Sequence, residues 1–221
     1  MLRVFYFLFL TFMLNTTALA QMSLIDHIQK AERSLVEVKT IYVKTIRHRA
    51  VSFERNGAGI VIDPSGLVVT NTHTIINAPH IFVILRDGTK LEAQVAFVSV
   101  EYDFSFLKIN PPHPLAAIAW ADSSQIRLGE QIAAVGNSDY DNQSILSGCV
   151  VSLLQSRLSG TIEFIETDLN LYQGDSGGPI LDGQGRLLGI VMAKAKHQDR
   201  TSLAIASDKI REQYLRWKQN M

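Results

Sequence analysis

Short apolar runs, each closed by turn-forming residues, recur along nearly the whole chain. Residues 58–62 are followed by the turn Asp63-Pro64-Ser65-Gly66, and residues 81–85 by the turn Arg86-Asp87-Gly88. Asp-Pro and Asp-Gly pairs between apolar runs are strong turn signals, and runs of this length are typical of strands. The pattern predicts an all-β domain. It includes one strand over about residues 36–46 and one continuous run over residues 91–100.

The β-rich runs form two sets, separated by a linker over residues 110–124 that carries Pro111, Pro112 and Pro114. Proline interrupts sheet pairing, so we expect two β-barrels, over roughly residues 35–110 and 125–206. Apolar residues at helical spacing predict a short helix over residues 24–35 and a C-terminal helix over residues 207–219.

The first twenty residues have the pattern of an export signal. A short basic start, Met1-Leu2-Arg3, precedes an apolar segment that ends in Ala18-Leu19-Ala20. Small residues at that spacing are the form that signal peptidase accepts, so we expect cleavage after Ala20. The alternative is an uncleaved membrane anchor, but the segment barely reaches the ~20 apolar residues that a membrane span needs.

Charge and cysteine content limit the possible partners and cross-links. The chain has 21 basic and 21 acidic residues with no long run of either sign, so neither nucleic acid nor an anionic membrane surface is an expected partner. Cys149 is the only cysteine, so an exported chain of this sequence has no internal disulfide.

The segment Gln173-Gly174-Asp175-Ser176-Gly177-Gly178-Pro179 sets a serine among glycines. Small neighbours let backbone N–H groups converge on one point, where the oxyanion of an acyl transfer would lie. A serine hydroxyl also needs a base to take its proton and a third group to orient that base. Taken alone, the segment could equally be a glycine-rich turn.

Candidates for both partners occur upstream. His73 ends the β-rich run that closes in Thr70-Asn71-Thr72-His73, and Asp103 opens the run Asp103-Phe104-Ser105-Phe106-Leu107. A lone histidine after a strand is more often a loop residue, and Glu101 is a rival carboxylate. The order His, Asp, Ser nevertheless matches one of the known arrangements of the serine triad.

With these motifs, the chain resembles the trypsin-like serine proteases, and within them the bacterial HtrA/Deg protease domain. Further matching blocks are Gly57-Ala58-Gly59-Ile60-Val61-Ile62, Val135-Gly136-Asn137 and Glu166-Thr167-Asp168. The resemblance implies a chymotrypsin/trypsin-like double six-stranded β-barrel over residues 21–221. It also implies catalysis by His73, Asp103 and Ser176 without a cofactor or metal.

The resemblance further assigns the oxyanion hole to the N–H groups of Gly174 and Ser176. Asp175 departs from HtrA proteases, where asparagine usually precedes the serine, and a buried carboxylate there requires a partner. The residues expected to line the substrate pocket are Asn170, Leu171, Met192, Lys194, Ser202 and Ala204. Asn170 stands where trypsins have the aspartate that selects Lys or Arg, so we expect small or medium aliphatic P1 residues.

The sequence therefore predicts an exported, periplasmic or secreted serine endopeptidase that acts on proteins or peptides. We expect no nucleic-acid partner and no stable membrane association after signal cleavage, while an oligomer stays possible. Most HtrA proteins continue into PDZ domains, which are not expected here. One alternative is a catalytically silent double barrel that binds unfolded or partner proteins. Another is an esterase that uses the same triad.

Overall fold

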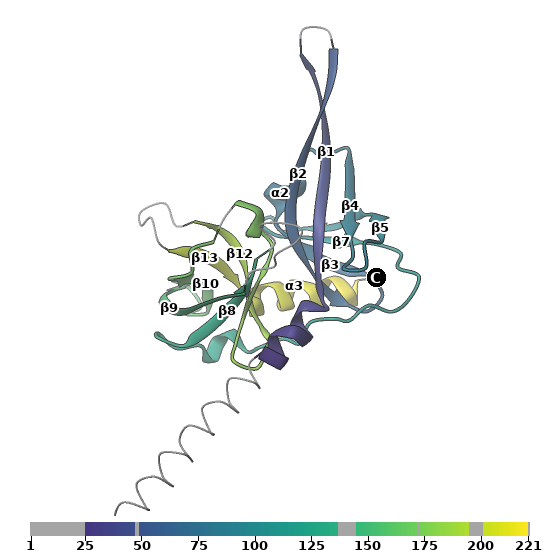
Figure 1. The fold of residues 1–221 in the computed structure, drawn as a ribbon. Helices are drawn as coiled ribbons and strands as arrows, with labels where there is room; N and C mark the ends of the chain where they lie inside the picture. Colours follow the sequence, from purple (N-terminus) through teal and green to yellow (C-terminus); the bar gives the residue numbers. More distant parts are fainter. Residues whose placement is uncertain (1–24, 47–48, 137–144, 172, 195–200, 221) are drawn as a thin grey trace, which may run out of the picture.

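The computed structural model describes residues 25–46, 49–136, 145–171, 173–194 and 201–220. Strands gather in two sheets, and the longer helices lie near the two ends of the described chain (Figure 1). Residues 25–32 are helical, and helix α3 (Ser207–Gln219) matches the predicted C-terminal helix. The prediction of a mainly β fold with short terminal helices is confirmed.

The first sheet contains seven strands in the order β5-β4-β1-β2-β3-β7-β6. Their bounds are β1 (Leu35–Ile46), β2 (Arg49–Asp63), β3 (Leu67–Thr70), β4 (His80–Ile84), β5 (Lys90–Glu92), β6 (Gln94–Val98) and β7 (Ser105–Lys108). It has one strand more than the six predicted, because the run expected over residues 91–100 is divided. At Ala93, β5 stops pairing with β4, and β6 then pairs with β7 instead.

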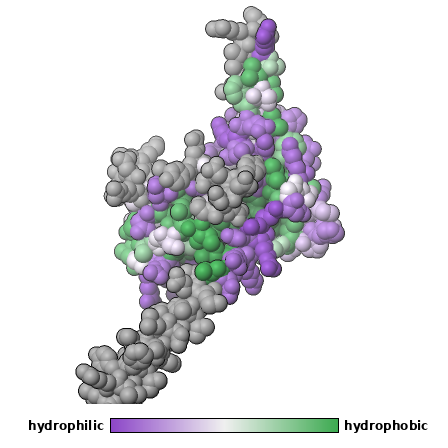
Figure 2. Space-filling view, viewed as in Figure 1, coloured by the Kyte–Doolittle hydropathy of each residue, from purple (hydrophilic) through white to green (hydrophobic). Residues whose placement is uncertain are grey.

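Strands β1 and β2 form a long hairpin that extends well beyond the rest of the sheet (Figure 1). The sequence pattern predicts β1 but no strand over residues 49–57, of which residues 49–56 are exposed on both faces of β2. Val43, Val51 and Phe53 expose 58%, 37% and 42% of their surfaces on this hairpin. Figure 2 shows apolar residues beside polar ones along it. Because neither face of the outer part of the hairpin is buried, its strands lack the alternation of apolar and polar residues by which a strand is predicted from a sequence.

The second sheet is a closed barrel in the order β10-β13-β12-β11-β8-β9, with the six strands predicted. Their bounds are β8 (Gln131–Val135), β9 (Ile145–Gln155), β10 (Ile162–Thr167), β11 (Pro179–Leu181), β12 (Leu187–Lys194) and β13 (Ser202–Ala206). Alternate residues of these strands fill the barrel, among them the fully buried Ile165, Ile180 and Ala206. Closure leaves these strands no open edge.

Helix α3 follows the last strand of the second barrel and packs against the first sheet. Tyr214 and Trp217 contact the ring of the buried Phe106 edge-on, with ring centroids 6.4 and 6.2 Å apart. Trp120, from the linker, stacks on Tyr214 at 6.4 Å. The single cysteine is free, so these aromatic contacts help to hold the two halves together without a disulfide.

Asp63, at the end of β2, anchors the same helix by polar contacts. Its carboxylate accepts hydrogen bonds from the Tyr214 hydroxyl at 2.7 Å and from the Lys218 ammonium at 3.2 Å. The Ser65 backbone amide donates to its other oxygen at 2.9 Å. Hydrogen bonds from Ser65, then from Tyr214, lower the pKa of Asp63 well below its usual range. The carboxylate is therefore more stable as an anion in the folded state than in the unfolded state.

The predicted signal, residues 1–20, lies outside the described residues. Among the residues that the structure describes, no helix combines the length and apolar character needed to cross a membrane.

Replacing Asp63 by asparagine keeps an oxygen for the Ser65 amide but removes the charge that Tyr214 and Lys218 contact. We expect Asp63→Asn to lower the free energy of unfolding by about 1.5 kcal/mol near neutral pH, the lower end of the range for hydrogen bonds to a charged group, because the Lys218 partner is exposed. Because the folded-state pKa is lowered, this contribution is fully present above the unfolded pKa of about 4 and is lost as the pH falls below it. Urea unfolding at neutral pH and at about pH 3 measures both effects.

Arg216→Gln is the matched control, because Arg216 lies on the same helix and its ion pair is with the exposed Glu212 of α3 itself. Such exposed pairs contribute about 0–1 kcal/mol. A stability gap between the wild type and Asp63→Asn that stays constant down to about pH 3 would contradict the assigned role of the carboxylate.

Candidate active site

His73 lies on a single helical turn that follows directly from a buried strand. Strand β3 ends at Thr70, and helix α2 (Thr72–Ile75) begins after Asn71, whose backbone is extended. Thr74 and Ile75 are buried and fix the inner face of this turn, while His73 points outward. The turn thus presents the imidazole just beyond the end of the inner strand β3.

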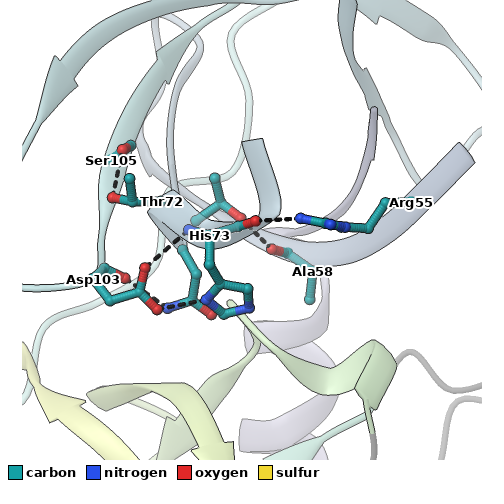
Figure 3. A network of polar contacts seen from close by, with 8 residues as sticks. Arg55, Ala58, Thr72, His73, Asp103 and Ser105 are labelled. Atoms are coloured by element: carbon teal, nitrogen blue, oxygen red, sulfur yellow. Dashed lines mark hydrogen bonds and ion pairs between the residues drawn. The ribbon is translucent and has the colours of Figure 1, made fainter. Parts of the chain in front are cut away.

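Asp103 contacts His73 at two places. The ring atom Nδ1 of His73 lies 2.5 Å from Oδ2 of Asp103, and the backbone N–H of His73 donates to Oδ1 at 2.9 Å (Figure 3). The side chains expose 46% and 28% of their surfaces, so the pair faces solvent on one side. One carboxylate therefore orients both the ring and the backbone of the histidine. Of the two neighbouring carboxylates, Asp103 is the one that contacts His73, whereas Glu101 is exposed.

Two aromatic residues fix the bend that carries Asp103. Tyr102 and Phe104, on either side of it, expose 8% and 0% of their surfaces, and their rings stack with centroids 6.4 Å apart. The Tyr102 hydroxyl donates to Glu163 of β10 at 3.1 Å, which links this bend to the second barrel. Burial, followed by the hydrogen bond to Glu163, raises the pKa of Tyr102, so its hydroxyl stays protonated and can donate.

Backbone contacts also join the His73 turn to the Asp103 bend. The Asn71 side-chain amide donates to the Asp103 carbonyl at 2.9 Å, and the Thr72 N–H lies 3.4 Å from the same oxygen. Asn71 is fully buried, and its own side-chain oxygen has no hydrogen-bond partner among the described residues. The Asn71 side chain therefore helps to position Asp103, a role that the sequence pattern did not predict.

Ser176 follows a short 3₁₀ turn, η2 (Gln173–Asp175), and is half-buried. Its carbonyl accepts a hydrogen bond from the Ala58 N–H of β2 at 2.8 Å. On the other side, Gly177 donates to Val191 of β12 at 2.9 Å. The serine loop therefore lies between the first sheet and the second barrel, as expected for a site shared by both halves.

Gly177 has to be glycine for two reasons. Its φ angle is +85°, which side chains disfavour, and an added Cβ would lie 2.2 Å from the Ala58 carbonyl oxygen. Gly174, which together with Ser176 is expected to form the oxyanion hole, is half-buried in η2, and Asp175 exposes only 2% of its surface. The burial expected for Asp175 is therefore present.

The six residues expected to line the substrate pocket lie on three neighbouring segments. Lys194 and Ser202 are paired across β12 and β13, and Ser202 donates through its hydroxyl to the Leu169 carbonyl at 2.8 Å. Leu171 and Ala204 are 2% and 1% exposed in the core of the second barrel. Met192 is half-buried, and Asn170 is exposed.

The side chain of Lys194 lies outside what the structure describes. A role in specificity for these six residues stays a prediction. Among the described residues, no group of three or more His, Cys, Asp or Glu side chains is arranged to hold a metal ion.

Comparison with known proteins links this geometry to a family. Residues 57–190, which include His73, Asp103 and Ser176, match the trypsin-like peptidase domain. The periplasmic pH-dependent serine endoprotease DegQ of Escherichia coli is 39% identical over 144 residues, which are 64% of this chain and 32% of DegQ. The serine protease HTRA1B of Danio rerio is 30% identical over 193 residues, or 85% of this chain and 40% of the relative. The chain thus spans about a third of the length of such relatives.

Solved structures show the same fold. The HtrA-type protease AlgW with a decapeptide superimposes with a TM-score of 0.76 at 24% identity, covering 89% of this chain and 68% of AlgW. An AlgW variant with a decapeptide gives a TM-score of 0.75, also at 24% identity, over 85% of this chain and 64% of the variant. The family match, the homologues and the shared fold agree with the motifs in the sequence. The chain therefore belongs to the trypsin-like peptidase family, with HtrA, DegQ and DegP proteases among its homologues.

Proposed function

We propose that this protein is an exported serine endopeptidase in which Ser176 is the nucleophile, His73 the general base and Asp103 the group that orients the base. The observation that carries the proposal is the double contact of the Asp103 carboxylate with the ring and backbone of His73. The anchoring of the Ser176 loop to strand β2 adds support, because β2 also packs against the turn that carries His73.

The chemistry follows from this orientation. With Nδ1–H held by Asp103, the Nε2 atom of His73 is the unprotonated nitrogen and can accept the Ser176 proton. Oγ of Ser176 then attacks the carbonyl carbon, and the N–H groups of Gly174 and Ser176 bind the oxyanion. As the intermediate collapses, Nε2 returns the proton to the leaving amine. Water repeats the attack on the acyl-enzyme, which releases the acid and regenerates the serine.

Proteins or peptides are the proposed substrates, since relatives such as DegQ and DegP carry the name of endoproteases. The periplasmic location in the names of these relatives also supports export of this chain. A silent double barrel would have no need for a histidine held in one orientation by a carboxylate. An esterase would share the same triad and would differ only in its substrates.

A fluorophosphonate probe tests the nucleophile directly. We expect the mature protein to be labelled on Ser176, with labelling abolished by Ser176→Ala and by His73→Ala, as measured by mass spectrometry of the labelled peptide. Asp103→Asn should lower turnover of a peptide substrate by up to about 10⁴-fold, the loss that this change causes in a chymotrypsin-type triad, because the imidazole takes the wrong tautomer.

Glu101→Gln is the matched control, since it removes the exposed carboxylate two residues away from Asp103, and its turnover should stay within about twofold of the wild type. Equal losses from both changes would move the orienting role away from Asp103. A folded wild-type protein that the probe does not label would favour the silent double barrel.

The substrate pocket gives a second test. Because Asn170 carries no negative charge, profiling of cleavage sites in a peptide library should show no preference for Lys or Arg at P1. Small or medium aliphatic P1 residues should dominate instead. A dominant basic P1 would overturn the proposed pocket, and a dominant Asp or Glu would assign the specificity to Lys194.

Export gives a third test. We expect the precursor to be cleaved after Ala20, so that the mature chain begins at Gln21. N-terminal peptide mass spectrometry of periplasmic and membrane fractions measures this directly. A chain that retains residues 1–20 in the membrane fraction would favour the anchored alternative.

A further inference from the structure

The four-residue helix α2 cannot satisfy its own backbone carbonyl groups, because the last four carbonyls of a helix have no partner within it. The structure shows where each of them is bonded. Within the turn and its exit, the Thr72 carbonyl accepts from Ile76 at 2.9 Å and the Ile75 carbonyl accepts from Ala78 at 3.1 Å. The carbonyls of His73, Thr74 and Ile76 are not bonded within the turn or its exit. All three are contacted by side chains at the root of the β1–β2 hairpin.

Arg55 on β2 donates from Nη1 to the His73 carbonyl at 2.6 Å. The Tyr42 hydroxyl on β1 lies 3.2 Å from the Thr74 carbonyl and 3.0 Å from the Ile76 carbonyl. The hydroxyl of the fully buried Thr40 lies 3.3 Å from the same Thr74 carbonyl. The hairpin root therefore binds the helical turn that carries His73 along its carbonyl side.

The pairing of the strands places these side chains together. Thr40 and Arg55 are direct partners across β1 and β2, and Tyr42 is two residues from Thr40 and thus on the same face. The Arg55 guanidinium lies over the Tyr42 ring, 5.1 Å from its centroid. Stacking of this kind restricts the conformations of an exposed and otherwise flexible side chain. It therefore favours the orientation in which Arg55 contacts the His73 carbonyl.

We propose that Arg55, supported by Tyr42, is a positioning residue for His73, an inference that rests on the proposed serine endopeptidase function. Asp103 holds the ring and the N–H of His73 on one side, and Arg55 holds its carbonyl on the other (Figure 3). Both peptide groups of the histidine are then fixed. This constraint limits how far the His73 ring can move, and in the proposed mechanism small displacements of the base strongly affect proton transfer.

The test compares Arg55→Met, Arg55→Lys and Arg49→Met in the full-length mature protein. Arg49 is an exposed arginine near the tip of the same strand, so its replacement controls for the loss of charge from the hairpin. We expect Arg55→Met to lower kcat and the rate of fluorophosphonate labelling by roughly tenfold with KM within about twofold, since a displacement near 1 Å can cost up to about 10²-fold. Arg55→Lys should recover part of the rate, and Arg49→Met should match the wild type.

A double-mutant cycle separates positioning from a merely structural role. In a His73→Ala background, Arg55→Met should change the residual hydrolysis of an activated ester by less than about twofold, because the group through which Arg55 acts is gone. Equal losses in both backgrounds would overturn the proposal, as would a wild-type labelling rate in Arg55→Met.

A spectroscopic readout does not depend on activity. The proton on Nδ1 of His73, bonded to Asp103, should give a downfield NMR signal that His73→Ala removes. Arg55→Met should shift or broaden this signal, and Arg49→Met should not. An unchanged signal would overturn the positioning role. Absence of probe labelling in the wild type, together with a signal that responds to Arg55, would instead reject the proposed function while retaining the contact between Arg55 and His73.

Discussion

The hydrogen bond from the Ala58 N–H to the Ser176 carbonyl, 2.8 Å long, joins the serine loop to the sheet that carries the histidine. Close approach at this point depends on Gly57. A Cβ on that residue would lie 2.8 Å from a Thr74 methyl group and 3.3 Å from the Ser176 carbonyl oxygen. Because Arg55 also contacts His73, three nearby residues of β2, Arg55, Gly57 and Ala58, support both the proposed base and the proposed nucleophile. The separation between these two segments is therefore set by the backbone of one strand.

Much of the fold could be predicted from local patterns. Turn residues such as Asp63-Pro64-Ser65-Gly66 mark where strands end, and the structure has the expected close pairing of β2 and β3 there. Local patterns failed in two places, each for a physical reason. The division at Ala93 changes only which strand is paired, so the apolar run itself gives no sign of it. Residues 49–56 form a ribbon exposed on both faces, so burial imposes no alternation on them.

The candidate site likewise contains residues that local sequence patterns predict and residues that they do not. His73, Asp103 and Ser176 could be found because each lies in a motif that chemistry restricts at adjacent positions. Arg55 and Tyr42 lie in no motif, and their partners are 18 and 32 residues away in the sequence. Their contacts exist only because the two strands pair in one register. Long-range positioning of this kind requires the three-dimensional structure.

The contact between His73 and Asp103 joins two segments that flank strands of the first sheet, whereas Ser176 belongs to the second barrel, so the site also depends on how the two halves pack. Tyr102 and Phe104 flank Asp103, and Tyr102 contacts both Phe164 and Glu163 of the second barrel. Phe104 packs on Phe106, which in turn contacts α3. The bend that orients the proposed base is thus part of the aromatic interface between the halves. With no disulfide to join them, the same apolar packing stabilises the fold and aligns the proposed catalytic groups.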